Sequence, residues 1–136
     1  MALTTVLEIE THPSGTVGLN GVVNGNWNRL EKVFGAVETL GSSGSINLDA
    51  NEERSKALDA LTGNVTFTTS NLVAGRHLRV RIPNGGTLRT LAFPAGWNFL
   101  GANAPASIDA NKVAVLELSV WGSTDSDVDA VFSVEP

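Results

Sequence analysis

The chain has no cysteine and no tyrosine among its 136 residues, and only two histidines. The lack of cysteine excludes disulfide scaffolds, cysteine-ligated zinc sites and thiol catalysis. Charged residues make up 17 % of the chain, below the roughly 25 % that is typical of globular domains. Nine basic residues stand against 14 acidic ones, for a net charge of −5, which argues against nucleic acid as a partner.

Long apolar runs are also missing. No stretch approaches the roughly 18 residues of a membrane-spanning helix, and residues 1–10 lack the basic start and apolar segment of a signal peptide. We therefore expect neither membrane insertion nor a secretory leader. The length fits a single domain. The 14 glycines, together with many threonines, asparagines and valines, are typical of strands and turns.

Residues 1–20 form the first region. In it, Leu7 and Ile9 alternate with Glu8 and Glu10, which is the two-residue period of a strand. The segment is too short to hold a core of its own. We predict an extended arm that attaches to a partner by strand addition or groove binding.

Residues 21–44 form the second region, with a predicted amphipathic helix over residues 24–41 followed by a glycine- and serine-rich linker. The apolar positions are spaced by three and four residues, as in a heptad repeat, and Gly41 suits the end of the helix. The stripe must pack on the β region or on copies of itself, and a three-fold bundle is one solution. The predicted trimer interface consists of Trp27, Leu30, Phe34 and Val37.

Residues 45–136 form the third region, in which short apolar runs alternate with glycine-, proline- and asparagine-containing breaks. This pattern predicts a mainly β fold, specifically an antiparallel, jelly-roll-like β-sandwich. The expected strands are residues 46–49, 55–61, 65–69, 78–82, 87–93, 113–121 and 128–134.

Four of the nine basic residues are arginines between positions 76 and 89, and no acidic residue lies among them. If residues 78–82 and 87–93 form a hairpin, Arg79, Arg81 and Arg89 could share one sheet face. Such a face would suit an anionic partner, either a carboxylate-bearing glycan or an acidic protein surface. The alternatives are a solvated face, or pairing with the acidic C-terminal third within or between subunits.

Two tryptophans are candidates for binding sugars. Trp97 and Trp121 lie in predicted loops, and exposed aromatic rings stack on sugar rings. The alternative is burial in a core or a subunit interface, where tryptophan is enriched. The candidate ligand face therefore consists of Arg79, Arg81, Arg89, Trp97 and Trp121.

Catalytic and metal-binding patterns are weak. Asp125, Asp127 and Asp129 offer alternate carboxylates of the kind that calcium prefers, but the glycine and distal glutamate of an EF-hand loop are missing. A polar hairpin turn is the other interpretation. Glu52 and Glu53 are adjacent, so on a strand they point to opposite sides and cannot flank one bond. We predict no enzyme activity, no metal and no cofactor.

Three segments carry a family resemblance: residues 61–68 (LTGNVTFT), 86–94 (GTLRTLAFP) and 112–122 (KVAVLELSVWG). Together they resemble a β-rich module of tailed-bacteriophage tail-fibre and virion-surface proteins, and the likeness covers roughly residues 45–136. The polar turn after Trp121 occupies the same relative place as in that module. The resemblance supplies no catalytic residues.

The resemblance implies a virion structural protein, commonly a homotrimer. The expected function is a short capsid-decoration, head-fibre or tail-fibre protein, attached through residues 1–20 to a capsid or tail protein of the same virion. It would be assembled in the reducing host cytoplasm and lie on the virion surface. The alternatives are a tail-fibre module that binds host surface glycans, and an adhesin-like or enzyme-accessory β-domain.

Overall fold

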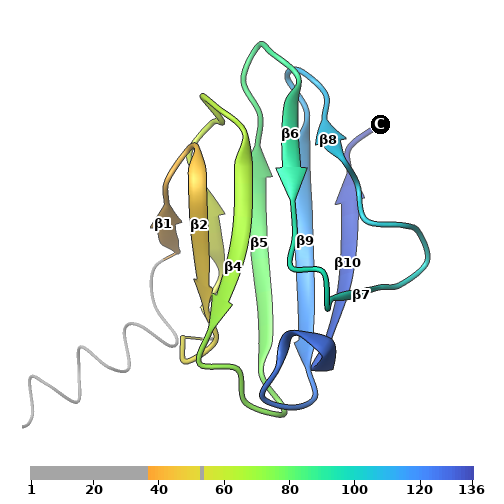
Figure 1. Ribbon diagram of the computed structural model, residues 1–136. Helices are drawn as coiled ribbons and strands as arrows, with labels where there is room; N and C mark the ends of the chain where they lie inside the picture. Colours follow the sequence, from red (N-terminus) through yellow and green to blue (C-terminus); the bar gives the residue numbers. More distant parts are fainter. Residues whose placement is uncertain (1–36, 53) are drawn as a thin grey trace, which may run out of the picture. The chain divides into compact units, whose positions relative to one another are not determined.

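The computed structural model describes residues 37–52 and 54–136, which contain ten strands arranged in two sheets (Figure 1). The six-stranded sheet contains, in spatial order, β1 (Glu38–Leu40), β3 (Lys56–Leu58), β5 (His77–Pro83), β9 (Val113–Val120), β10 (Val128–Val134) and β7 (Asn98–Phe99). The four-stranded sheet contains β2 (Gly44–Asp49), β4 (Val65–Ser70), β6 (Arg89–Ala92) and β8 (Ser107–Ile108). A short 3-10 helix, η1 (Asp125–Asp127), precedes β10.

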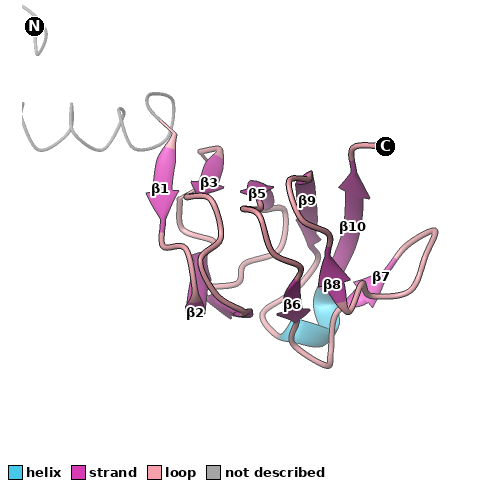
Figure 2. Cartoon of the chain, turned by 90° about the horizontal axis from the view of Figure 1, so that it is seen from above, coloured by secondary structure: helices cyan, strands magenta, loops and turns pink. Residues whose placement is uncertain are grey.

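The two sheets face one another and share one hydrophobic core. Seen from above, β1, β3, β5, β9 and β10 form one layer, and β2, β6 and β8 lie in the other (Figure 2). Along β5 and β9 every second side chain is buried, as the two-residue period of a strand requires. Fully buried core side chains include Leu48, Phe67, Leu78, Val80, Ile82, Leu116 and Leu118. Truncating one such leucine to alanine costs about 2–5 kcal/mol.

The first six strands alternate between the two sheets along the chain. The chain places β1, β3 and β5 in one sheet and β2, β4 and β6 in the other, so each strand runs parallel to the strand two positions earlier. Glu38 pairs with Lys56 in the first layer, and Gly44 pairs with Val65 in the second. Within residues 37–52 and 54–136, antiparallel pairing is confined to β5–β9, β9–β10 and β6–β8.

The prediction of a mainly β fold is therefore confirmed, whereas that of an antiparallel, jelly-roll-like arrangement is wrong. Short turns carry the chain across to the opposite sheet instead of folding it back as a hairpin. The turn after β5 shows why. Asn84 is buried, and its Nδ2 donates hydrogen bonds to the carbonyls of Thr87 (2.9 Å), Ile108 (3.1 Å) and Asp109 (2.9 Å). These bonds direct the chain toward the second sheet, so residues 78–82 and 87–93 do not form the hairpin on which a shared arginine face depends.

The C-terminal part of the predicted helix is a strand. Glu38–Leu40 form β1, which pairs with β3, and Gly41 follows a strand instead of ending a helix. Glu38 and Leu40 share one side of β1 and pair with Lys56 and Leu58 of β3. This pairing makes the segment a strand, although its apolar residues have the spacing of a helix. Val37 is 55 % exposed just before β1. The arm at residues 1–20 and the helix positions Trp27, Leu30 and Phe34 lie outside the described residues.

Candidate functional site

The exposed side of the six-stranded sheet gathers most of the polar candidates. We call this side the outer face; it consists of the side chains of β5, β9 and β10 that point away from the core. Strand register places them in rows, because directly paired residues share a face. One row is His77, Ser119 and Asp129, the next is Arg79, Glu117 and Val131, and a third contains Arg81 and Val115.

The two arginines of β5 differ in their electrostatic partners. Arg79 Nε lies 3.0 Å from Glu117 Oε1 on the neighbouring strand, so its charge is largely balanced. Both side chains of this pair are well exposed, at 64 % and 37 %, and such a pair contributes at most about 1 kcal/mol. Arg81 is exposed and has no ion-pair or hydrogen-bond partner among the described residues. It therefore offers an uncompensated cation.

A groove of about 610 Å³ lies beside these arginines. Its walls are largely aliphatic, and its charged lining residues are Arg79, Arg81 and the buried Lys56. The lining residues are Val37, Ser55, Lys56, Ala57, Arg79, Arg81 and Val115. A groove of this kind suits a ligand that combines apolar surface with one negative charge.

Trp121 lies at the end of β9, beyond the row that contains Asp129. Its side chain is 69 % exposed. The indole Nε1 donates a hydrogen bond of 2.9 Å to Asp129 Oδ2, and the backbone N–H of Trp121 donates to the carbonyl of Asp127 at 2.8 Å. The ring is thus exposed to solvent but held at one edge. Gly122 follows it, and a Cβ there would lie 2.3 Å from Asp127 Oδ2, so a larger residue would displace the Asp127 side chain from its hydrogen bonds with Thr124.

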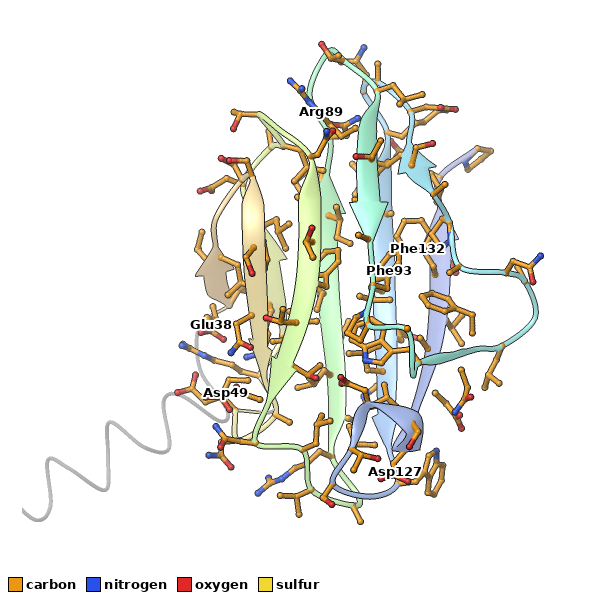
Figure 3. All side chains as sticks on the ribbon, viewed as in Figure 1. Glu38, Asp49, Arg89, Phe93, Asp127 and Phe132 are labelled. Atoms are coloured by element: carbon orange, nitrogen blue, oxygen red, sulfur yellow. The ribbon has the colours of Figure 1, made fainter. Side chains whose placement is uncertain are left out.

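Trp97 belongs to the core and not to the outer face. It is only 6 % exposed, and its ring lies 5.7 Å from Phe93 and 6.2 Å from Phe99. Phe93 also contacts Phe67 and Phe132, and so connects aromatic side chains of both sheets (Figure 3). The predicted alternative of core burial is confirmed for Trp97, whose ring is not available to stack on a sugar.

Arg89 is also separate from the other candidates. It lies on β6 of the four-stranded sheet and is partly buried. Figure 3 places Arg89 and Asp127 at opposite ends of the strands, and Asp127 accepts the backbone hydrogen bond of Trp121. The expectation that Arg89 shares a face with Arg79 and Arg81 is wrong, because β5 and β6 belong to different sheets. Of the predicted ligand face, Arg79, Arg81 and Trp121 lie on the outer face, with Arg81 opposite Val115, six residues from Trp121 along the chain.

The three aspartates after Trp121 accept hydrogen bonds from three different partners. Asp125 accepts from the Thr69 hydroxyl, and Asp129 accepts from Trp121. Asp127 accepts from the backbone N–H and the hydroxyl of Thr124, which lowers the pKa of Asp127. These contacts favour the interpretation as a polar turn. Among the residues that the structure describes, no three histidine, cysteine, aspartate or glutamate side chains converge as metal ligands.

A charged cluster at β1 and β3 is not predicted by the sequence analysis. The Lys56 side chain is fully buried and pairs with Glu38, which Arg54 also approaches at 3.9 Å. The sequence does contain a sign that Lys56 is buried. Lys56 precedes the buried Leu58 by two residues and so shares its face of the strand. The cluster lies at the edge of the core, where it holds the first strand of the described chain.

Comparison with protein-family models, with curated proteins and with solved structures finds no match to this chain. No helix in the described part of the chain is long and apolar enough to cross a membrane.

Proposed function

We propose that the protein is a bacteriophage virion structural protein, a short homotrimeric capsid-decoration, head-fibre or tail-fibre protein attached through residues 1–20. The observation that supports this best is that residues 36–136 form a compact unit with a hydrophobic core of their own. A β domain built in this way can project outward while the preceding segment serves attachment and assembly. The phage-like segments 61–68, 86–94 and 112–122 all lie within this unit.

The trimer is proposed to assemble through Trp27, Leu30 and Phe34, with Val37 at the start of the β domain. Native mass spectrometry of the full chain should give a mass of three copies. Phe34→Asp should dissociate the trimer, whereas Val73→Asp places the same charge at an exposed apolar position of a loop and should leave it intact. A stable wild-type monomer would overturn the trimer.

Attachment is tested on particles. Virions assembled with the full chain should carry the protein at one kind of surface position in electron micrographs. A chain that lacks residues 1–20 should fold with the same β-sheet circular dichroism but be absent from the particles. Unchanged incorporation of the truncated chain would remove the attachment arm, and absence of the full chain from the particles would remove the virion role.

A second candidate function is a host-glycan receptor-binding module. It is favoured by the presence of Arg79, Arg81 and Trp121 on one exposed sheet face, since aromatic surface with a few polar or charged groups is typical of ligand sites. This proposal does not include Arg89, which lies on the four-stranded sheet, or Trp97, which is buried. A glycan array probed with the full chain tests it.

A further inference from the structure

We infer that Trp121 and Asp129 form a binding site for a neutral sugar ring, with the indole as the stacking surface and the carboxylate as the acceptor of sugar hydroxyls. This inference rests on the second candidate function and specifies its ligand class. It concerns one end of the outer face and does not require Arg89, Trp97 or the groove beside Arg81.

The exposure of Trp121 is the first observation. Among the large exposed hydrophobic side chains of the described chain, it has the highest exposed fraction, 69 %. Burying apolar surface of this size would stabilise the fold, and Trp97 shows that this core accepts an indole. An indole left in water therefore offers apolar surface that a ligand can cover.

The fixed position of the ring is the second observation. The 2.9 Å hydrogen bond from Nε1 to Asp129 holds one edge of the indole, and the 2.8 Å bond from the backbone N–H of Trp121 to the carbonyl of Asp127 fixes the main chain of the same residue. Asp129 itself lies within β10, which pairs with β9 on one side and β7 on the other. A ligand therefore meets a ring that already has its bound orientation, which reduces the loss of conformational entropy on binding.

The chemistry of the neighbours indicates the ligand. The face of an indole is apolar and carries the negative side of its quadrupole, which suits the C–H groups of a pyranose. Asp129 Oδ2 accepts the indole N–H, and Oδ1 has acceptor capacity left for a sugar hydroxyl. Ser119 is directly paired with Asp129 on the adjacent strand and adds a hydroxyl on the same face.

Charge separates neutral from anionic sugars. The carboxylates nearest the indole are Asp129 and Asp127, and both would repel a carboxylated or sulfated sugar. Arg76 and His77, at the start of β5, lie closer to the indole, and both already take part in interactions within the chain. Arg79, in the next row, is balanced by Glu117 at 3.0 Å. Arg81, which has no ion-pair partner among the described residues, lies two residues further along β5, at the groove. A neutral hexose or N-acetylhexosamine is therefore favoured at Trp121.

The test is a titration of the full chain with maltoheptaose, mannopentaose and N-acetylchitotetraose as neutral probes, and with sialyllactose and trigalacturonate as anionic ones. Saturation-transfer NMR should show ring-proton contact for at least one neutral probe. Trp121→Ala should weaken that binding about tenfold or more, and Asp129→Ala should weaken it as well. Val131→Ala, on the same face, should bind as the wild type does, and circular dichroism should show all variants folded.

Three outcomes would overturn the inference: none of the neutral probes binds, Trp121→Ala binds them unchanged, or the chain prefers the anionic probes. In the last case, loss of binding in Arg81→Ala would leave the glycan-receptor function standing with a different ligand and site. The virion role is judged separately, because electron microscopy of particles does not depend on any sugar. Failure of one proposal is thus distinguishable from failure of the other.

Discussion

Lys56 and Glu38 face one another across the parallel pair of β1 and β3 and form an ion pair whose ammonium group is fully buried. Arg54 lies 3.9 Å from the other oxygen of Glu38, so one carboxylate serves two cations. The carboxylate is partly exposed, at 25 %, and the lysine is not, at 0 %. Loss of Glu38 would therefore leave a buried positive charge without its partner, which is much costlier than loss of the whole pair.

Glu38→Gln should destabilise the protein by roughly 3 kcal/mol, near the lower end of the range for breaking a buried pair, because Glu38 retains some contact with water. Lys56→Met should be close to neutral, since it replaces the buried ammonium by apolar volume. The double variant Glu38→Gln/Lys56→Met should recover most of the stability lost in Glu38→Gln. Urea unfolding followed by circular dichroism gives the three values. Equal stability of Glu38→Gln and the wild type would show that the pair contributes nothing.

The aromatic cluster around Phe93 should be a second determinant of stability. Its ring lies 5.3 Å from Phe67, 5.1 Å from Phe99, 5.7 Å from Trp97 and 6.2 Å from Phe132. Phe93→Ala removes all four contacts and should cost about 3–5 kcal/mol. Thermal or urea unfolding measures the loss.

The tryptophans provide the matched comparison for that cluster. Trp97→Ala should also cost about 3–5 kcal/mol, but Trp97→Phe should cost much less. The buried Nε1 of Trp97 has no hydrogen-bond partner in the described structure, so phenylalanine removes an unsatisfied donor together with some apolar area. Trp121→Ala, at the exposed position, should change stability by less than about 0.5 kcal/mol. A large effect at Trp121 would indicate that its ring is covered in the folded protein.

Asn84 provides a third prediction. Its amide nitrogen donates to three backbone carbonyls, and its Oδ1 accepts from the N–H of Gly85 at 2.9 Å. Asn84→Asp replaces these donors with a carboxyl group that can donate once when protonated and not at all when ionised. Burial beside carbonyl oxygens should raise the pKa of the new carboxyl in the folded state. The stability of the variant should therefore fall as pH rises through that value.

The measurement is the free energy of unfolding of Asn84→Asp at pH values from about 4 to 8, with Asn84→Ala as the control. The alanine variant should lose about 1–3 kcal/mol with no new pH dependence. A flat profile for Asn84→Asp would mean that its carboxyl is solvated, and the hydrogen-bonded turn would then not be what directs the chain to the second sheet.

The sequence predicts individual strands well and their pairing poorly. Alternation along Leu78, Val80 and Ile82 identifies β5, and its partner pattern along Leu116, Leu118 and Val120 identifies β9. Whether a strand folds back on its neighbour depends instead on contacts such as those of Asn84 with Ile108, 24 residues later. Local hydrophobic patterns contain no information about such distant contacts. The parallel pairing of β1 to β6 could therefore not be predicted from them. The two-residue strands β7 and β8 are too short to show a period.

The candidate site was predicted in part for the same reason. Arg79 and Arg81 alternate with buried residues, so their common face follows from the sequence. Trp97 and Trp121 both lie in loops, yet only Trp97 is flanked by phenylalanines, Phe93 and Phe99, that can enclose it. The position of Trp121 beside Asp129 depends on the register of β9 and β10, which the sequence leaves open.

Asp49, at the end of β2, leads to the last prediction. Asn71 Nδ2 donates to Asp49 Oδ1 at 2.9 Å, as does the backbone N–H of Asn51, and both bonds favour the ionised form. The hydrogen bond from Asn71 is the main cause of the lowered pKa of Asp49, and partial burial opposes it. Because the folded-state pKa lies below the unfolded one, the stabilisation is fully present above about pH 4 and is lost as pH falls through the folded-state pKa.

Asn71→Gly should raise the pKa of Asp49 toward its ordinary range and remove this acid-dependent part of the stability, which carboxyl-carbon NMR titration and urea unfolding below pH 4 can measure. Asn71 has a positive φ of 55°, so glycine fits its backbone without strain. Asn111→Gly is the matched control, because Asn111 has a φ of 58° and no hydrogen bond to Asp49 is found among its contacts. The control should leave the titration of Asp49 unchanged. If both variants shift the pKa of Asp49 equally, or neither does, the Asn71 amide is not what holds that pKa down.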